Sequence, residues 1–344
     1  MSTIKVGIIG AGMIAHGSHA EAFGKEPDVE IAAVADLDSA RGVEFGEKFS
    51  IPRVFTSYEQ MLREVDLDAV SVALPVFLHA PATIAALKAG KHVLCEKPMA
   101  RNLAEAEEMV ATASNSKRKL QVYWRYRFSR EATKARELIA SGRLGEVHYA
   151  RTVGLRWRGR PGFDANMSRF GKWFGRKNEA GGGTVMDIGG YAIDLVMGLL
   201  RFPEVASVSG VTFQGIERDR ARLEGYDVED FAVGLIRLKN GACINMESAF
   251  ASNIDGPNGT WFFGTLAGLR MDPLTLSYPN ADQKKQEEAV DVSGVTATSP
   301  VHQFVSAIRD DKPIAISSGD EALVVQRLQD ALYRSAAAGR EVTL

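Results

Sequence analysis

The first part of the chain alternates between short apolar runs and stretches in which apolar residues recur every three or four positions. The apolar runs, which predict strands, are 4–10, 29–35, 69–74, 92–95 and 119–124. The helical pattern between them covers 13–25, 39–49, 57–65, 79–90 and 102–117. Apolar strands that alternate with helices form a parallel sheet covered on both faces. Residues 1–122 are therefore expected to form one α/β domain.

The pattern changes after residue 123. The sequence predicts helices at 130–141, 184–200, 300–310 and 319–337, a long loop at 159–183, and strands at 145–158, 204–214, 229–239, 242–251 and twice within 259–272. Asn240-Gly241 joins two of these strands and is the strongest short pattern for a hairpin. The polar segment 273–297 is expected to be an exposed loop. Residues 123–344 thus predict an α+β domain built on an open, mostly antiparallel sheet.

Composition narrows the function classes. The 344 residues are 45% apolar and 24% charged, as in an ordinary folded protein, and the net charge of −2 gives no reason to expect nucleic acid. No apolar run approaches the ~20 residues of a membrane span, and we expect neither a membrane partner nor a secretion signal. Cys95 and Cys243 lie in separate apolar runs. They predict two buried thiols in a reducing cytoplasm.

A glycine-rich turn directly follows the first predicted strand. Residues 10–15 read GAGMIA, which matches G-x-G-x-x-A at the start of a helix. Glycines allow a tight turn and close approach of a pyrophosphate, which the helix N-terminus then faces. The pattern predicts a dinucleotide-binding site that includes Gly10, Gly12, Met13 and Ile14.

Asp36 ends the second predicted strand, 21 residues after Ala15. A carboxylate at this place accepts hydrogen bonds from a ribose 2′-hydroxyl and repels a 2′-phosphate. Arg41 lies five residues further on and would either counter that charge or be a solvated helix residue. We therefore predict NAD as the cofactor, with NADP less favoured.

Residues 94–98, LCEKP, place two charges and a proline at the carboxyl end of a buried strand. Ligands of parallel sheets bind beyond the carboxyl ends of the strands. We expect Glu96 and Lys97 to point into the nucleotide crevice and Pro98 to fix the chain behind them. A lysine there can transfer a proton or lower the pKa of a neighbouring phenol.

The predicted helix 184–200 carries a narrow polar stripe. At about 100° per residue, Asp187, Tyr191 and Asp194 share one side, and the rest of the helix is apolar. A helix that is apolar nearly all round is buried, and its carboxylates need partners or a cleft. Asp194 is expected to be structural, for example paired with an arginine. Asp187 and Tyr191 are candidate site residues, because the glycines before them suggest close approach of a ligand or of the other domain.

At these residues the chain resembles the glucose–fructose oxidoreductase/inositol dehydrogenase (Gfo/Idh/MocA) family. The resemblance covers nearly the whole chain through VGIIGAGMIA, HAPATIAALKAGKHVLCEKPMA, YRFSREATKARELIASGRLGEV, AGGGTVMDIGGYAIDLV, FFGTLAGLRMD and ALYRSAAAGREV. It implies a Rossmann domain and an open-sheet domain often used for oligomerisation. It also implies NAD(P)-dependent transfer of a hydride at a secondary hydroxyl or ketone of a sugar, cyclitol or related polyol.

The resemblance also assigns roles by position. Lys97 matches the catalytic lysine of the family and Asp187 its motif aspartate, and both would touch the substrate. Tyr191 stands where many members have histidine, which argues against an inositol-type enzyme with a histidine base. Leu74, Pro75 and His79 match the turn over the cofactor, although His79 would equally suit the start of a helix.

Several alternatives stay open. The loop 156–177 has seven Lys or Arg against one Asp, and these charges would bind an acidic sugar or pair with another subunit. Trp173 in this loop is a candidate for stacking on a sugar or nicotinamide. His16 and His19 have no carboxylate cluster nearby, so we expect no metal. The strands of 204–264 lack enough helices to cover both faces, which favours a homodimer or homotetramer.

Two other functions compete with a sugar or polyol dehydrogenase. One is a dihydrodiol dehydrogenase-like enzyme acting on a less polar diol. The other is a non-catalytic NAD-binding regulator of the same fold, because fold alone does not fix function. A regulator would be expected to have lost Lys97 or the pair of Asp187 and Tyr191, and the sequence retains all three.

Overall fold

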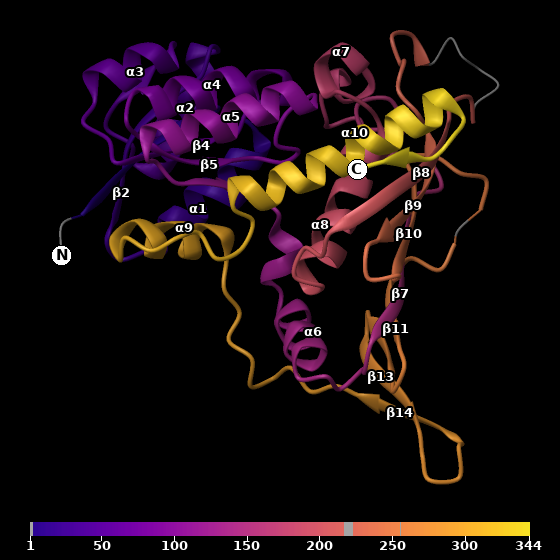
Figure 1. The fold of residues 1–344 in the computed structure, drawn as a ribbon. Coiled ribbons are helices and arrows are strands. Elements are labelled where there is room, and N and C mark those ends of the chain that lie inside the picture. The colour runs from indigo at the N-terminus through magenta and orange to yellow at the C-terminus, as the bar shows by residue number, and fades with distance from the viewer. Residues whose placement is uncertain (1–2, 217–222, 255) are drawn as a thin grey trace. The chain divides into compact units, whose positions relative to one another are not determined.

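The computed structural model describes residues 3–216, 223–254 and 256–344, traced in Figure 1. Contacts divide the chain into two compact units, Met1–Trp124 with Thr298–Leu323, and Arg125–Ala297 with Val324–Leu344. This differs from the expected division into 1–122 and 123–344, because residues 298–323 return to the first unit. The reason is helix α9 (Pro300–Arg309), whose Val301, Phe304 and Val305 are buried in the first unit's core.

The first unit contains a parallel sheet, as predicted, but with six strands where five were predicted. Its strands are β1 (Ile4–Ile9), β2 (Val29–Ala35), β3 (Val54–Phe55), β4 (Ala69–Val72), β5 (His92–Cys95) and β6 (Leu120–Val122). Their order is β3-β2-β1-β4-β5-β6. The order reverses between β1 and β4, so the loops that follow these two strands flank the crevice where such sheets bind ligands. Every residue of β4 is buried, which explains its uninterrupted small and apolar sequence.

Helices connect these strands. They are the π turn η1 (Ala15–Ala20) continuing into α1 (Glu21–Phe23), then α2 (Ser39–Phe49), α3 (Tyr58–Glu64), the 3-10 turn η2 (Val76–Leu78) with α4 (His79–Lys88), and α5 (Leu103–Ser116). Asp38, Ser57 and Asn102 cap α2, α3 and α5 by accepting backbone N–H bonds. The helices were predicted within a few residues of these bounds. The exception is the first helix, which starts as a π turn.

The second unit contains a nine-stranded, mostly antiparallel sheet. Its strands are β7 (Val147–Leu155), β8 (Val205–Phe213), β9 (Phe231–Leu238), β10 (Cys243–Ala249), β11 (Gly259–Gly264), β12 (Gly268–Met271), β13 (Leu274–Pro279), β14 (Lys285–Ala289) and β15 (Val342–Thr343). They lie in the order β14-β13-β12-β11-β7-β10-β9-β8-β15, with β7 and β10 parallel.

The expectation that 273–297 is a loop was wrong. Strand β13 pairs with β12 and buries Leu274 and Leu276, whereas β14 pairs with β13 as an exposed edge strand. The sequence of β14, KQEEA, is polar throughout because neither of its faces is buried. An edge strand of this kind gives no alternation of apolar and polar residues that a sequence could reveal.

Helices cover one face of this sheet. The second unit's helices and turns are η3 (Arg125–Phe128), α6 (Arg130–Ala140), η4 (Ala165–Met167), η5 (Lys172–Gly175), α7 (Lys177–Ala180), the π turn η6 (Val185–Gly189) running into α8 (Gly190–Leu199), and the larger part of α10 (Gly319–Ala338). Helix α8 contacts β7 and β10, and Leu332 of α10 lies against Gly210 and Gly234. No helix within 3–216, 223–254 and 256–344 is long and apolar enough to span a membrane.

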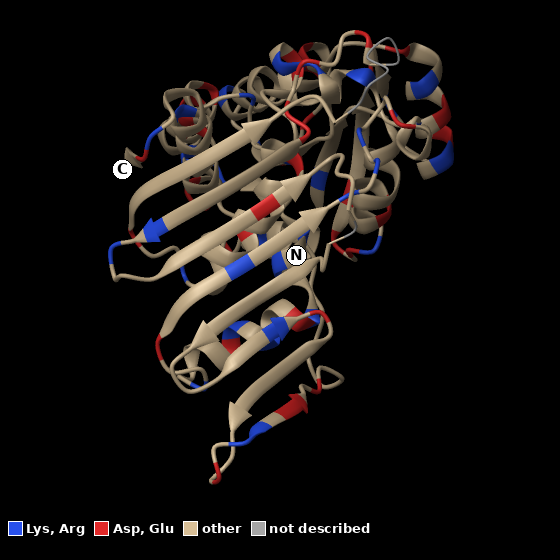
Figure 2. Cartoon of the chain, turned by 90° about the vertical axis from the view of Figure 1, so that its right-hand side faces the viewer, with Lys and Arg blue, Asp and Glu red and all other residues tan. Residues whose placement is uncertain are grey.

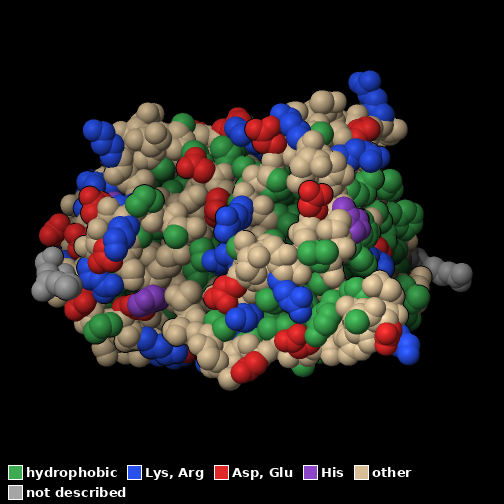
Figure 3. Space-filling view, turned by 60° about the horizontal axis from the view of Figure 1, so that its bottom comes forward, with side chains coloured by type: hydrophobic (Ala, Val, Ile, Leu, Met, Phe, Trp, Pro, Cys, Tyr) green, Lys and Arg blue, Asp and Glu red, His purple; other side chains and the backbone are tan. Residues whose placement is uncertain are grey.

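The other face, here called the outer face, has no helix in front of it among the described residues (Figure 2). Val211, Phe213 and Phe263 are 66%, 53% and 41% exposed. Hydrophobic side chains gather on the right-hand side of the molecule in Figure 3, where Figure 1 places the strands of this sheet. The prediction of an open sheet is confirmed.

Candidate functional site

The turn after β1 contains two glycines, Gly10 and Gly12, and each is required for a different reason. Gly10 has φ +97°, and a Cβ there would lie 2.5 Å from the carbonyl oxygen of Ala73, so packing inside the chain requires glycine. A Cβ at Gly12 would meet nothing within 4 Å. The space beside Gly12 is open to close approach of a ligand, which fits the pyrophosphate of a dinucleotide. Met13 and Ile14, at the start of the helix, are 54% and 40% exposed.

Asp36 holds this turn from the end of β2. Its carboxylate accepts the N–H of Ala11 at 2.8 Å and that of Asp38 at 2.9 Å. The guanidinium of Arg41 lies 3.8 Å from Asp36 and 3.1 Å from Asp38. Arg41 is therefore an ion-pair partner of both carboxylates, which corresponds to the first of its two expected roles.

A buried chain of polar side chains joins three elements of the first unit. His19 lies 2.6 Å from the hydroxyl of Ser71 through Nδ1 and 3.0 Å from the carboxylate of Glu96 through Nε2. Since a carboxylate only accepts, Nε2 is the donor to Glu96. Burial alone would raise the pKa of Glu96, but the hydrogen bond from His19 and the neighbouring positive charges leave this pKa below its usual value.

Glu96 therefore points inward, and not into the crevice as expected. Its second oxygen accepts the backbone N–H of Lys97 at 3.0 Å, so the carboxylate fixes the chain from which the lysine side chain extends. Lys97 itself is part-exposed at the carboxyl end of β5. The sequence predicted Lys97 at the end of this strand and took His19 for a helix residue beside the cofactor, but it did not reveal that His19 binds Glu96.

His79 links the two loops that border this edge of the sheet. Its Nε2 lies 2.8 Å from the carbonyl oxygen of Leu74 and its Nδ1 2.8 Å from that of Pro98, and the side chain is 1% exposed. Burial lowers the pKa of His79, although both carbonyls favour the protonated ring. Both ring nitrogens are thus engaged within the protein. The geometry suits a residue that positions the Leu74-Pro75 turn beside Gly10, not one whose nitrogens contact a cofactor.

In the second unit, the predicted polar stripe is divided. Asp187 lies in the π turn, and its carboxylate is 3.7 Å from the guanidinium of Arg156 at the end of β7. Tyr191, in α8, stacks on Tyr126 with ring centroids 4.4 Å apart. Asp194 is buried with Arg127 at 3.3 Å, which confirms its expected structural pairing. Each of the three side chains thus contacts a different residue of its own unit.

The start of this helix is held by Glu229. Its carboxylate accepts the N–H groups of Gly183 and Val185, each at 2.9 Å, and the hydroxyl of Tyr333 at 2.7 Å. Gln329 donates to the carbonyl of Val185 at 3.0 Å. Burial raises the pKa of Glu229, and its three hydrogen bonds oppose that shift. Sequence reasoning missed this cluster, because no motif marks a glutamate 44 residues from its partner.

The same cluster explains the glycines before Asp187. A Cβ at Gly182 would overlap the hydroxyl of Tyr333, and one at Gly183 would overlap the backbone carbonyl of Glu229. The close approach that these glycines permit is therefore to Tyr333 and Glu229 of the same unit, not to a ligand or to the other domain.

The basic loop 156–177 is largely engaged within its own unit. Arg160 is fully buried, with Asp230 at 2.6 Å and Asp164 at 3.4 Å. Arg158 donates to the carbonyls of Trp157 and Ser252, at 2.7 and 2.5 Å. These contacts tie the loop to the sheet.

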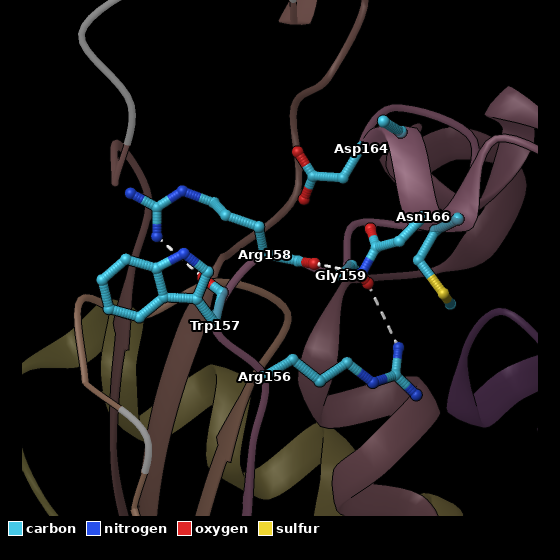
Figure 4. Close-up of a pocket in the computed structure, with 8 residues that line it drawn as sticks. Arg156, Trp157, Arg158, Gly159, Asp164 and Asn166 are labelled. Atoms are coloured by element: carbon cyan, nitrogen blue, oxygen red, sulfur yellow. Dashed lines mark hydrogen bonds between the residues drawn. The ribbon is translucent and has the colours of Figure 1, made fainter.

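Trp173, the predicted stacking residue, packs on Phe174 with ring centroids 3.8 Å apart. An open cavity of about 410 Å³ lies elsewhere in the loop (Figure 4). Its lining comes from 156–159 and 164–167 and does not include Trp173. The residues that the structure describes contain no group of three or more His, Cys, Asp or Glu arranged to hold a metal ion.

Comparison with known proteins agrees with this architecture. Residues 4–124 match the "Oxidoreductase family, NAD-binding Rossmann fold" (GFO_IDH_MocA), and residues 132–270 match the "GFO/IDH/MocA C-terminal domain". The D-glucoside 3-dehydrogenase of Escherichia coli (strain K12) is 32% identical over 355 residues, covering 100% of this chain and 98% of that protein. The trans-1,2-dihydrobenzene-1,2-diol dehydrogenase of Mus musculus is 30% identical over 275 residues, with 79% and 75% covered.

Among solved structures, the aldose–aldose oxidoreductase from Caulobacter crescentus, complexed with glycerol, superposes with a TM-score of 0.83. It is 26% identical, with 99% of this chain and 100% of that chain covered. The chain belongs to the Gfo/Idh/MocA family of oxidoreductases. The predictions of the family, of the fold, of an NAD-binding first unit and of an oxidoreductase are thereby confirmed.

Proposed function

We propose that this enzyme oxidises a secondary hydroxyl of a sugar, most specifically of a glycoside, with NAD as hydride acceptor. The observation that carries the proposal is that Lys97, Asp187 and Tyr191, three side chains able to hold or move a proton, are each fixed by neighbours in an NAD-binding oxidoreductase. Glu96 fixes the backbone of Lys97, Arg156 faces Asp187, and Tyr126 stacks on Tyr191. The names of the bacterial relatives, a glucoside dehydrogenase and an aldose oxidoreductase, support a sugar as substrate.

The residues would divide the work as follows. When bound, NAD supplies the carbon that accepts the hydride, and Gly12, Met13, Ile14 and Asp36 would hold it. The carbon that gives up the hydride bears a hydroxyl, and this hydroxyl loses a proton that a side chain within hydrogen-bond reach must take.

The proton acceptor would be the phenolate of Tyr191, and the positive charge of Lys97 would favour this form by lowering the pKa of the phenol. A tyrosine has an ordinary pKa near ~10 and is a poor base near neutrality, but an adjacent ammonium favours the phenolate. Asp187 would orient the substrate or keep Lys97 charged. In the alternative, Lys97 is itself the acid and base, and Tyr191 only binds the substrate hydroxyl.

Two substitutions test the proposal. Lys97→Ala should lower kcat by about 10²–10⁴ while NAD binding, measured by fluorescence titration, survives. Tyr191→Phe should lower kcat comparably if the phenol carries the proton, and should mainly raise KM if it only binds. Lys91→Ala, at the amino end of the same strand, is the matched control and should keep wild-type turnover. Near-wild-type turnover in both Lys97→Ala and Tyr191→Phe would show that the site is placed wrongly.

A less polar diol is the second candidate substrate. The part-exposed stack of Tyr126 and Tyr191 offers an aromatic surface beside the proposed catalytic phenol, and the mouse relative is named for a dihydrobenzene diol. Absorbance of the reduced cofactor, followed with a panel of glycosides, polyols and trans-diols, distinguishes the two substrates. A non-catalytic regulator would reduce NAD with none of them.

Assembly and location complete the proposal. We infer a homodimer or homotetramer that associates through the outer face, whose apolar side chains include Val211, Phe213 and Phe263. A cytoplasmic location is supported by two free thiols, the buried Cys95 and Cys243, which is partly exposed and not buried as expected.

A further inference from the structure

The cavity in the basic loop has rigid walls. The chain beyond β7 stays paired with the chain beyond β10, since the N–H of Gly159 donates to the carbonyl of Phe250 at 2.7 Å and that of Ser252 to Trp157 at 3.2 Å. The amide of Asn166 donates to the carbonyl of Arg158 at 2.7 Å. A cavity whose lining is already ordered costs a ligand little conformational entropy on binding.

Trp157 is the unusual member of this lining. Its side chain is 52% exposed on a backbone that is fixed on both sides. The guanidinium of Arg158 lies 5.3 Å from the indole centroid and is itself held by the side-chain oxygen of Asn253 at 2.7 Å. Trp157 and Arg158 lie on one side of the cavity, and Asp164 and Asn166 on the other (Figure 4). A half-exposed indole on a fixed backbone offers a flat apolar surface on which a planar ligand can stack.

Arg156 connects the cavity to the proposed catalytic centre. It lines the cavity, donates to the carbonyl of Gly159 at 3.2 Å, and places its guanidinium 3.7 Å from the carboxylate of Asp187. A ligand that reaches Asp187 and extends past Arg156 would therefore enter the cavity.

We propose that the cavity is a second subsite, which receives the aglycone or second sugar ring of a glycoside and stacks it on Trp157. The inference rests on the proposed function and specifies its substrate, because a free monosaccharide would leave the cavity empty. The substrate is accordingly a glycoside with a ring-shaped aglycone or a disaccharide, and Trp157 is the residue that selects it.

The charges of the lining favour an uncharged occupant. Arg156 faces the carboxylate of Asp187, and Asp164 is paired with the buried Arg160. Arg158 donates three hydrogen bonds to neutral oxygens of the protein, those of Trp157, Ser252 and Asn253. The polar groups are thus largely matched within the unit, and stacking on the indole is left as the main attraction.

The test compares kcat/KM with NAD for methyl β-D-glucopyranoside, phenyl β-D-glucopyranoside, cellobiose and phenyl β-D-glucuronide. The wild type should prefer the phenyl glucoside and cellobiose to the methyl glucoside. Trp157→Ala should lower kcat/KM for these two by roughly three- to tenfold, and change the methyl glucoside by less than about twofold. Trp157→Phe, which keeps a flat ring, should restore part of the loss.

Phe170→Ala is the matched control, since Phe170 lies in the same loop under Arg169, at 4.9 Å, but outside the cavity lining. It should leave the preference unchanged. Equal loss for all substrates in Trp157→Ala, or a changed oligomeric state, would overturn the subsite. A preference for the glucuronide that Trp157→Ala does not alter would overturn the uncharged class. If no substrate reduces NAD in the wild type, the proposed function fails, and the subsite with it.

Discussion

The carboxylate of Asp36 has three partners inside the protein, the N–H groups of Ala11 and Asp38 and the guanidinium of Arg41, and one is expected outside it. It anchors the glycine turn through the N–H of Ala11 and would accept the ribose 2′-hydroxyl of NAD. A 2′-phosphate would meet its charge, only partly offset by Arg41 at 3.8 Å. We predict that the wild type prefers NAD in kcat/KM. Asp36→Ala should narrow the gap to NADP by roughly 1–3 kcal/mol.

Two further variants separate the roles of Asp36. Asp36→Asn keeps an acceptor for the N–H of Ala11 but loses the charge. It should reduce the preference for NAD over NADP in kcat/KM nearly as much as Asp36→Ala does. Asp38→Ala removes the other carboxylate partner of Arg41 and should leave the NAD preference in place. A wild type that prefers NADP would contradict the assignment directly.

His92 makes the stability of the first unit depend on pH. Its Nδ1 accepts the N–H of Lys119 at 2.9 Å. Burial, followed by the charges of Arg118 and Lys119, lowers its pKa to about 4, against about 6.5 in an unfolded chain. The neutral ring therefore contributes stability that is fully present above pH ~6.5 and is lost as the pH falls towards 4.

Urea unfolding at pH 7 and pH 4.5 measures this contribution. His92→Asn keeps an acceptor for Lys119 but does not titrate, so it should lose less stability between the two pH values than the wild type. The difference should stay below the ~1.4 kcal/mol per pH unit of a fully shifted group, because His92 is partly exposed. His302→Asn, on the surface of α9, is the control. Parallel losses in wild type and His92→Asn would refute the effect.

At the scale of single residues, the sequence predicted side chains that belong to a motif of fixed spacing. It did not reveal side chains whose partners lie far away along the chain. Lys97 and Asp187 were found because each has a fixed spacing from a strand end or a glycine run. The partners His19 and Glu229 lie 77 and 44 residues from the groups they bind, and nothing local marks them. The inward turn of Glu96 follows from the same cause, since its direction depends on a histidine in another element.

Glu229 holds the turn that leads into helix α8, because its carboxylate accepts the N–H groups of Gly183 and Val185 much as a capping residue does. Glu229→Gln would turn an amide N–H₂ towards one of the two N–H donors, Gly183 or Val185, and leave that donor unsatisfied at a cost of about 1–3 kcal/mol. Because these donors directly precede Asp187, we predict that kcat falls by roughly tenfold to a hundredfold, while KM for NAD is unchanged. Tyr333→Phe removes one hydrogen bond and should give a smaller loss.

Ser335→Ala provides the control for this prediction. Ser335 lies on the same helix as Tyr333 and is buried, but it bonds the N–H of Gly210 and the carbonyl of Arg340. It should lower the urea midpoint without changing kcat. If Glu229→Gln lowers stability and leaves kcat intact, the glutamate supports the fold alone.

Strands were predictable where a run of apolar residues marks them, and were missed where they are very short or lie in polar sequence. Strands β1, β4 and β5 lie in the interior of the sheet, with a strand on each side, and are largely apolar. Each was predicted from its sequence. Strands β3, β13, β14 and β15 were missed. Two residues, as in β3 and β15, show no period, β14 is exposed throughout, and β13 lies in a segment that reads as polar. The π turn of η6 was not predictable either, since its register depends on Glu229 and Gln329, which lie outside the segment.

At the scale of the whole molecule, the outer face leaves the apolar side chains of Val211, Phe213 and Phe263 exposed beside charged ones, and an exposed apolar patch marks an interaction surface. Arg151 of β7 and Glu247 of β10 form an ion pair at 3.0 Å on this sheet. A stable interface buries about 800 Å² on each partner, which a nine-stranded face can supply. We predict a homodimer or homotetramer by light scattering at micromolar concentration. Phe263→Lys should shift it towards monomer, because a charge replaces a ring at the contact.

Leu266→Lys distinguishes that contact from a general effect of added charge. Leu266 is 63% exposed but lies in the turn between β11 and β12, away from the paired strands. The substitution should therefore leave the assembly intact. A wild-type monomer at micromolar concentration, or equal dissociation by Phe263→Lys and Leu266→Lys, would show that the strands of the outer face do not form the interface. The exposed aromatic side chains of this sheet would then need another partner.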